Sequence, residues 1–177
     1  MNYFEFYELP EAFHVDEAQV KRKFYSLSKE FHPDFYVNDT PEKQQEILEL
    51  STQNNKAFQV LSKPEKRLEY ILQLHKQIAE GDKYQLPQEF LMEMMEVNEE
   101  LMELEFDPNA EALEKLQRQV LSIEEELLLE LDSCTTRYDK EEKQSEKELF
   151  LLKIKDLYYR QKYLLRIKES LNTFAHR

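Results

Sequence analysis

The chain has very little of what turns, disulfides and membrane spans require. Its 177 residues include one glycine, Gly81, and six prolines, which leaves almost no material for the tight turns of a β-sheet protein. The apolar content of 41% is that of an ordinary water-soluble folded protein. The composition therefore predicts an all-α fold.

Long apolar stretches are also missing. The chain has no run of about 18 apolar residues, the length that a bilayer-spanning helix needs. Residues 1–6 have neither the basic start nor the apolar stretch of a secretory signal. We therefore expect a cytoplasmic protein with no membrane partner.

Cysteine is nearly absent as well. Cys134 is the only one in the chain, so it cannot form an internal disulfide, and no Cys-x-x-Cys pair or close histidine cluster offers the ligands of a structural zinc site. Cys134 falls on the apolar stripe of a predicted helix, which indicates a core residue rather than a nucleophile. We expect no metal, no cofactor and no catalytic residue.

Basic residues are outnumbered by acidic ones. The formal net charge is −13 at pH 7. The negatively charged phosphates of a nucleic acid would therefore be repelled by the overall electrostatic field of the chain. Protein partners are favoured, and we expect no nucleic-acid partner. Most of the acidity follows residue 76, and the segment that holds Gly81 and Pro87 separates the two parts. We expect a domain at 1–76, a linker at 77–87 and a second domain at 88–177.

The first long helix of the N-terminal part is strongly amphipathic. Asp16 and Gln19 have the spacing of a capping box, and the helix should end near Phe31, because proline disfavours helical geometry for the residue before it. Its apolar stripe consists of Val20, Phe24, Leu27 and Phe31. The opposite face forms a small basic surface with Lys21, Arg22, Tyr25 and Lys29. Taken alone, such a face is usually only solvated.

A second long helix should pair with the first in antiparallel fashion. A loop from residue 32 leads to Thr40-Pro41, which supplies a helix cap and a first-turn proline. A third helix opens near Pro64, and Gly81 closes the N-terminal region. Beyond Pro87 the pattern predicts a bundle of three antiparallel helices, at 88–105, 109–138 and 142–174.

The predicted helix at 88–105 has two apolar stripes where a bundle helix needs one. The first stripe consists of Phe90, Met94, Val97, Leu101 and Leu104. The second consists of Leu91, Met92, Met95 and Met102, and it lies beside Glu96 and Glu99. Methionine suits an adaptable protein-binding surface, so the second stripe favours a partner. The alternatives are that both stripes are buried in the core, or that one packs on the N-terminal part.

The loop His32-Pro33-Asp34 gives the sequence its most informative motif, because a rigid proline holds an imidazole and a carboxylate at a helix-helix turn. With the basic helix before it and Asn55-Lys56-Ala57-Phe58 after it, the arrangement resembles a J-domain. Segments 64–75 and 90–93 extend the likeness to the HscB co-chaperones of iron-sulfur cluster assembly. One departure is Phe35, since J-domains usually have a basic residue after this motif.

The resemblance implies a function and its residues. The N-terminal J-domain would stimulate ATP hydrolysis by an HscA- or DnaK-type chaperone, and the C-terminal helices would bind the iron-sulfur scaffold IscU and deliver it. The chaperone-binding residues carried over from the family are His32, Pro33, Asp34, Lys21, Arg22 and Lys29. The scaffold-binding residues are Leu91, Met92, Met95, Glu96 and Glu99. An aromatic contact on the last helix best matches Tyr159, with Tyr158 and Tyr163 close by.

Three other functions compete with this interpretation. A general J-domain protein would recruit DnaK to a different client and would show no affinity for IscU. An enzyme could use His32 and Asp34 as an acid-base pair, but no nucleophile, metal set or glycine-rich phosphate loop accompanies them. A purely structural helical protein would carry the basic face and the methionine stripe without using them.

Overall fold

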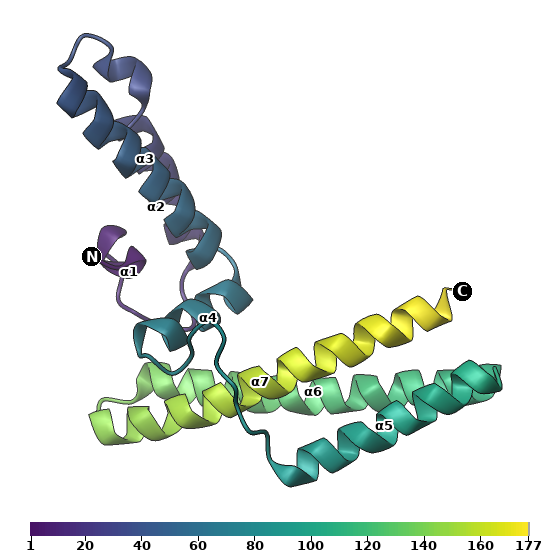
Figure 1. Cartoon of the computed structure of the whole chain (residues 1–177). Helices are drawn as coiled ribbons and strands as arrows, with labels where there is room; N and C mark the ends of the chain where they lie inside the picture. The colour runs from purple at the N-terminus through teal and green to yellow at the C-terminus, as the bar shows by residue number, and fades with distance from the viewer. Residues whose placement is uncertain (177) are drawn as a thin grey trace. The chain divides into compact units, whose positions relative to one another are not determined.

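The computed structural model describes residues 1–176 and is all-helical, without a strand in that range (Figure 1), which confirms the predicted fold class. The elements in chain order are α1 (Tyr3–Phe6), α2 (Glu17–Glu30), the 3-10 helix η1 (Pro33–Tyr36), α3 (Pro41–Leu61), α4 (Pro64–Leu74), α5 (Gln88–Phe106), α6 (Ala110–Lys140) and α7 (Gln144–Ala175). They divide into two compact units, the first ending at Lys76 and the second beginning at Gln77. None of the described helices is both long and apolar enough to span a bilayer.

Side-chain caps mark where α2 and α3 begin, whereas α4 begins at Pro64 without a side-chain cap. The Asp16 carboxylate accepts hydrogen bonds from the backbone N–H groups of Ala18 and Gln19, so it satisfies two of the donors that a helix start leaves unpaired. Thr40 caps α3 through Lys43 N–H, and Pro41 occupies the first helical position. Asp16 and Thr40 are therefore confirmed as the N-caps of α2 and α3.

The core of the first unit lies between α2 and α3, and α1 closes one side of it. The hydroxyl of buried Tyr7 donates to Asn54 Oδ1 at 2.8 Å, and the Asn54 amide donates to Phe24 O and Ser28 Oγ. This network links the segment after α1 to both long helices. A buried amide that is fully hydrogen-bonded in this way stabilises one specific packing.

A second buried polar residue connects α4 to the rest of the first unit. The Arg67 side chain has 3% of its surface exposed, and its Nε and Nη1 donate to the carbonyl oxygens of Phe13 and Leu61 at 2.8 and 2.6 Å. Burying a guanidinium costs free energy unless its donors are satisfied. Arg67 therefore holds the loop before α2 and the end of α3 in place.

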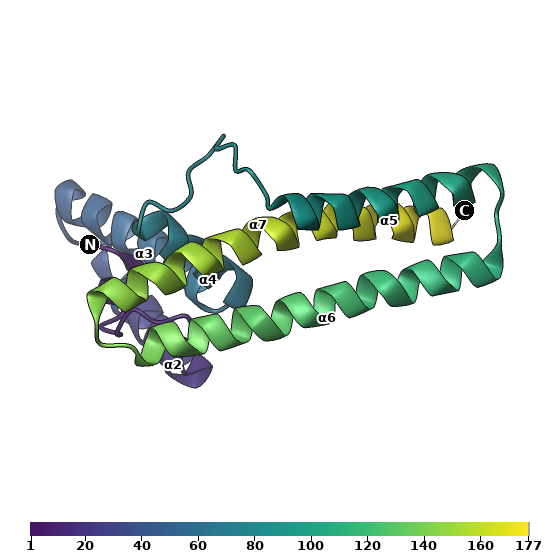
Figure 2. The same cartoon turned by 90° about the horizontal axis from the view of Figure 1, so that it is seen from below.

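The second unit is a three-helix arrangement. Helices α6 and α7 run antiparallel over their length, and α5 packs beside the C-terminal half of α7 (Figure 2). The apolar core joins all three helices and consists of Phe90, Met94, Val97, Leu101, Leu104, Leu116, Val120, Leu164, Ile167 and Leu171. Cys134 is also buried, and burial raises the pKa of its thiol, so its prediction as a core residue is confirmed.

Two local features of the first unit add to what the sequence predicted. Residues 33–36 form the 3-10 helix η1 within the segment that the sequence predicted as a loop, because Pro33 at its first position has the required φ angle. Helix α4 ends at Leu74, well before Gly81, and the chain leaves it through Lys76 in a left-handed conformation with φ of 56°. The turn chemistry that glycine usually supplies is supplied here by a lysine.

Candidate functional site

The loop His32-Pro33-Asp34, which we call the signature loop, directs polar groups toward solvent. His32 precedes η1, and its Nδ1 accepts a hydrogen bond from the Asp34 backbone N–H at 3.3 Å. The Asp34 carboxylate lies 3.7 Å from the same Nδ1, and the two side chains are 52% and 84% exposed. An imidazole and a carboxylate are thus displayed together at the end of the α2–α3 hairpin, where a protein partner can reach both.

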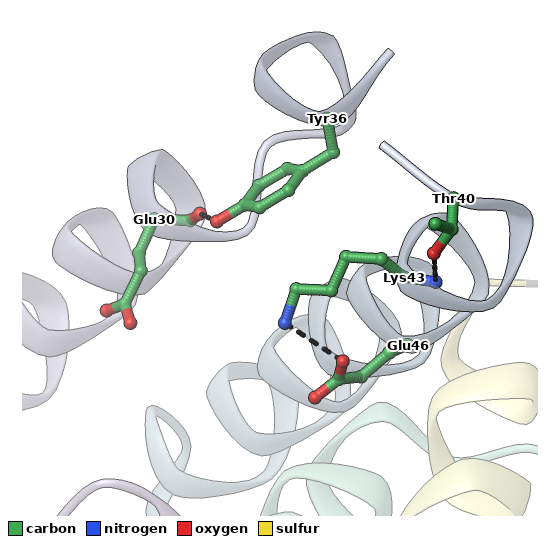
Figure 3. Close-up of polar contacts among 5 residues, drawn as sticks. All are labelled: Glu30, Tyr36, Thr40, Lys43 and Glu46. Atoms are coloured by element: carbon green, nitrogen blue, oxygen red, sulfur yellow. Dashed lines mark hydrogen bonds and ion pairs between the residues drawn. The ribbon is translucent and has the colours of Figure 1, made fainter. Parts of the chain in front are cut away.

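Hydrogen bonds tie the segment between α2 and α3 to both of these helices. The Tyr36 hydroxyl donates to the Glu30 carbonyl at 2.7 Å, while Thr40 caps α3 at Lys43, whose Nζ pairs with Glu46 at 2.9 Å (Figure 3). The Gln44 amide further donates to two loop carbonyls. Because this segment is anchored at both ends, His32 and Asp34 are held in position before any partner binds.

The predicted basic face consists of Lys21, Arg22, Tyr25 and Lys29, and the side chains of its three cations are all exposed. None of them forms an ion pair with another residue in the range 1–176. Lys23, by contrast, is paired with Glu8 and lowers the pKa of that carboxyl. The three cations of the basic face are therefore available to an acidic partner.

A shallow open hollow of about 560 Å³ lies between α2 and the signature loop. Its lining consists of Tyr25, Ser26, Ser28, Lys29, His32, Asp34 and Phe35. The ring of Phe35 meets the His32 ring edge to face, with centroids 5.8 Å apart. The hollow thus joins the signature loop to one cation of the basic face.

Helix α5 has the two apolar stripes that its sequence predicted. The first stripe is buried against α6 and α7. In the second, Leu91 is partly buried, whereas Met92, Met95 and Met102 are exposed; this rules out the alternative that both stripes lie in the core. We call Leu91, Met92, Met95 and Met102, with the exposed Glu96 and Glu99 beside them, the methionine face.

Phe106 was not among the predicted site residues, and 90% of its surface is exposed at the end of α5. It lies four residues after Met102 and so continues the methionine face by one helical turn. The predicted helix ended one residue too early to include it. Its spacing of four residues from Met102 was the signal that the sequence offered.

Tyr159 is partly buried on α7, and its ring contacts those of Tyr84 and Tyr158. Its ring stacks on Tyr84 with centroids 4.5 Å apart and planes 11° apart. The Tyr84 hydroxyl donates to Asp156 Oδ1 at 2.7 Å, and Arg160 holds the other carboxylate oxygen at 2.7 Å. Burial raises the pKa of Tyr84 to about 12. Of the neighbouring candidates, Tyr158 is buried and therefore unsuited to a surface contact.

Comparison with known proteins agrees with this division into two units. Residues 2–70 match the DnaJ domain family, and residues 86–172 match the family described as the HscB C-terminal oligomerisation domain. These two matches define the class of the protein, a J-domain co-chaperone with a helical C-terminal domain.

Individual relatives identify the family. The co-chaperone protein HscB of Buchnera aphidicola (subspecies Acyrthosiphon pisum, strain Tuc7) is 33% identical over 163 residues, which cover 89% of this chain and 92% of that protein. The HscB homologue of Vibrio vulnificus (strain YJ016) is 34% identical over 137 residues, 72% of this chain and 80% of the relative. The chain belongs to the HscB family of co-chaperones.

Solved structures have the same architecture. The chaperone HscB from Vibrio cholerae superimposes with a TM-score of 0.65 at 28% identity, covering 99% of this chain and 98% of that one. The human co-chaperone HscB gives a TM-score of 0.70 at 25% identity, covering 98% of this chain and 81% of the human one.

Proposed function

We propose that this protein stimulates ATP hydrolysis by an HscA- or DnaK-type chaperone through residues 1–76. Through residues 88–177 it delivers an IscU-type iron-sulfur scaffold to that chaperone in the cytoplasm. The observation that carries the proposal is the separation of two unlike exposed surfaces. The first unit has the signature loop beside unpaired cations, and the second has an apolar face beside glutamates.

The chaperone contact combines charge attraction with the signature loop. Lys21, Arg22 and Lys29 have no ion pairs with other described residues, so an acidic chaperone surface gains their attraction without breaking existing contacts. Such attraction steers association more than it strengthens the complex. His32 and Asp34 then supply the directional hydrogen bonds at the loop.

The scaffold contact depends on the methionine face. Burying each of these apolar side chains contributes about 1.5–3 kcal/mol, so a few of them give moderate affinity after the costs of association. Glu96 and Glu99 border the face and favour a partner with basic residues around an apolar centre. Tyr159 belongs to this proposed site as a contact on α7.

The deciding experiment is single-turnover ATP hydrolysis by HscA or DnaK of the same organism. This protein is added alone, and then together with IscU. Synergy between the two supports the proposal. Stimulation with no added effect of IscU favours the general J-domain protein with another client. Absence of any stimulation refutes the chaperone contact.

A further inference from the structure

Two large aromatic side chains stand exposed at the hollow beside the signature loop. Phe35 is 72% exposed and Tyr25 is 61% exposed, and both line the hollow. Such apolar surface gains free energy when a partner covers it. The two rings come from different elements, α2 and η1, so the fold brings them to the same hollow.

Of the charged groups at the hollow, the carboxylate has a neighbour of complementary character and the cation has none among the described residues. The Asp34 carboxylate lies near the His32 ring, at 3.7 Å from Nδ1. Lys29 has no ion pair with any residue that the structure describes. A partner that fills the hollow therefore meets two aromatic rings and one uncompensated cation.

We infer that Tyr25 and Phe35 form an apolar subsite for an Hsp70-type chaperone. The subsite receives one apolar side chain of the chaperone, and a neighbouring chaperone carboxylate pairs with Lys29. This inference rests on the proposed function, because His32 and Asp34 of the signature loop also line the hollow. The open shape suits a side chain presented by a protein better than a free small molecule, which would stay largely solvated.

The occupant is assigned to the chaperone on continuity and charge. The hollow adjoins the basic face, because Lys29 of that face also lines the hollow. A second copy of this chain, with its net charge of −13, is the less suitable occupant because two copies repel each other. The subsite would make the contact partly apolar, and so partly insensitive to salt.

The test uses the 177-residue chain and measures the concentration of this protein that half-maximally stimulates ATP hydrolysis by the chaperone. Phe35→Ala should raise that concentration about tenfold, which corresponds to about 1.4 kcal/mol. Phe35→Leu keeps an apolar side chain and should recover most of the loss. Leu48→Ala, which removes an exposed apolar side chain of α3 outside the hollow, is the matched control and should change nothing.

A double-mutant cycle checks whether the two rings hold the same side chain. If they do, Tyr25→Ala combined with Phe35→Ala should cost less than the product of the two single effects. Circular dichroism on each variant confirms that the helices are intact.

The inference is overturned if Phe35→Ala and the natural chain give the same half-maximal concentration, or if the two single effects multiply. Failure of the proposed function has a different signature, since the natural chain itself would then not stimulate the chaperone.

Discussion

The Nδ1 atom of His32 accepts a hydrogen bond from the backbone N–H of Asp34, two residues further along its own loop. A nitrogen that accepts a hydrogen bond carries no proton, so in the neutral ring the proton is on Nε2. The loop thereby selects one tautomer and one ring orientation. In that tautomer Nε2 is the ring atom that can donate a hydrogen bond.

Replacing this imidazole should abolish chaperone stimulation without unfolding the protein. In His32→Gln the side chain is exposed, so we expect a free energy of unfolding within about 0.5 kcal/mol of the natural chain. Single-turnover ATP hydrolysis and thermal unfolding of the same preparation test the two statements together. A large loss of thermal stability would show that His32 acts through the fold instead.

Truncating the methionine face should weaken scaffold binding and leave stimulation by the first unit intact. For Leu91→Ala, Met92→Ala and Met95→Ala combined we expect the Kd for IscU to rise by at least about tenfold, because several apolar side chains lose their contacts. Isothermal titration calorimetry measures the affinity.

A matched control for that variant is available on α7. Leu149 and Leu152 are exposed leucines that lie outside α5, and Leu149→Ala with Leu152→Ala removes comparable apolar surface. Scaffold affinity should be unaffected. If the two variants weakened binding equally, the loss of affinity would not be specific to the methionine face.

Chaperone stimulation should decrease as salt rises. Exposed charges are screened over about 8 Å at physiological ionic strength, and the three cations of the basic face are exposed. A variant with alanine at Lys21, Arg22 and Lys29 should stimulate more weakly and depend much less on salt. For each protein, the half-maximal concentration is measured across a sodium chloride series, and the slope of its dependence on salt is compared between the two proteins. Equal slopes for the two proteins would exclude the basic face.

The second unit should lose stability in alkaline solution through Tyr84. Its pKa is about 12 in the folded chain against about 10 in an unfolded one. Between these values the unfolded state releases the phenol proton and the folded state keeps it, so stability falls as pH rises. The stability difference between the natural chain and Tyr84→Phe should be constant below about pH 10 and shrink above it. Urea unfolding at several pH values measures this difference. A difference that stayed constant above about pH 10 would argue against a raised pKa of Tyr84.

The buried arginine of α4 should be essential for the first unit. In Arg67→Met two backbone carbonyls lose their donor, so we expect a loss of about 2–4 kcal/mol. Its exposed neighbour provides the control, because Lys66→Met removes a charge at the surface and should cost less than about 0.5 kcal/mol. Urea unfolding followed by circular dichroism compares them.

Periodicity was sufficient to predict most of the helices and the two stripes of α5. The reason is that burial of Phe90 and exposure of Met92 follow from their angular positions on one helix. The assignment of residues to partners is different, since it came from the family resemblance. Those roles stay predictions.

Contacts between distant segments could not be predicted in this way. The stack of Tyr84 on Tyr159 joins the predicted linker to a helix far along the chain, and no local pattern encodes such a pair. Arg67 was equally hidden, because an arginine in an amphipathic helix is usually exposed. Its burial depends on carbonyl groups supplied by two other segments.

The single buried thiol of Cys134 makes the natural chain a convenient background for fluorescent labelling. A thiol that is buried and has a raised pKa presents little thiolate to maleimide reagents while the protein is folded. Cysteines introduced at one exposed position in each unit would then react selectively. Energy transfer between a donor and an acceptor dye on such a pair could follow the two units during a chaperone cycle, without first removing any natural residue.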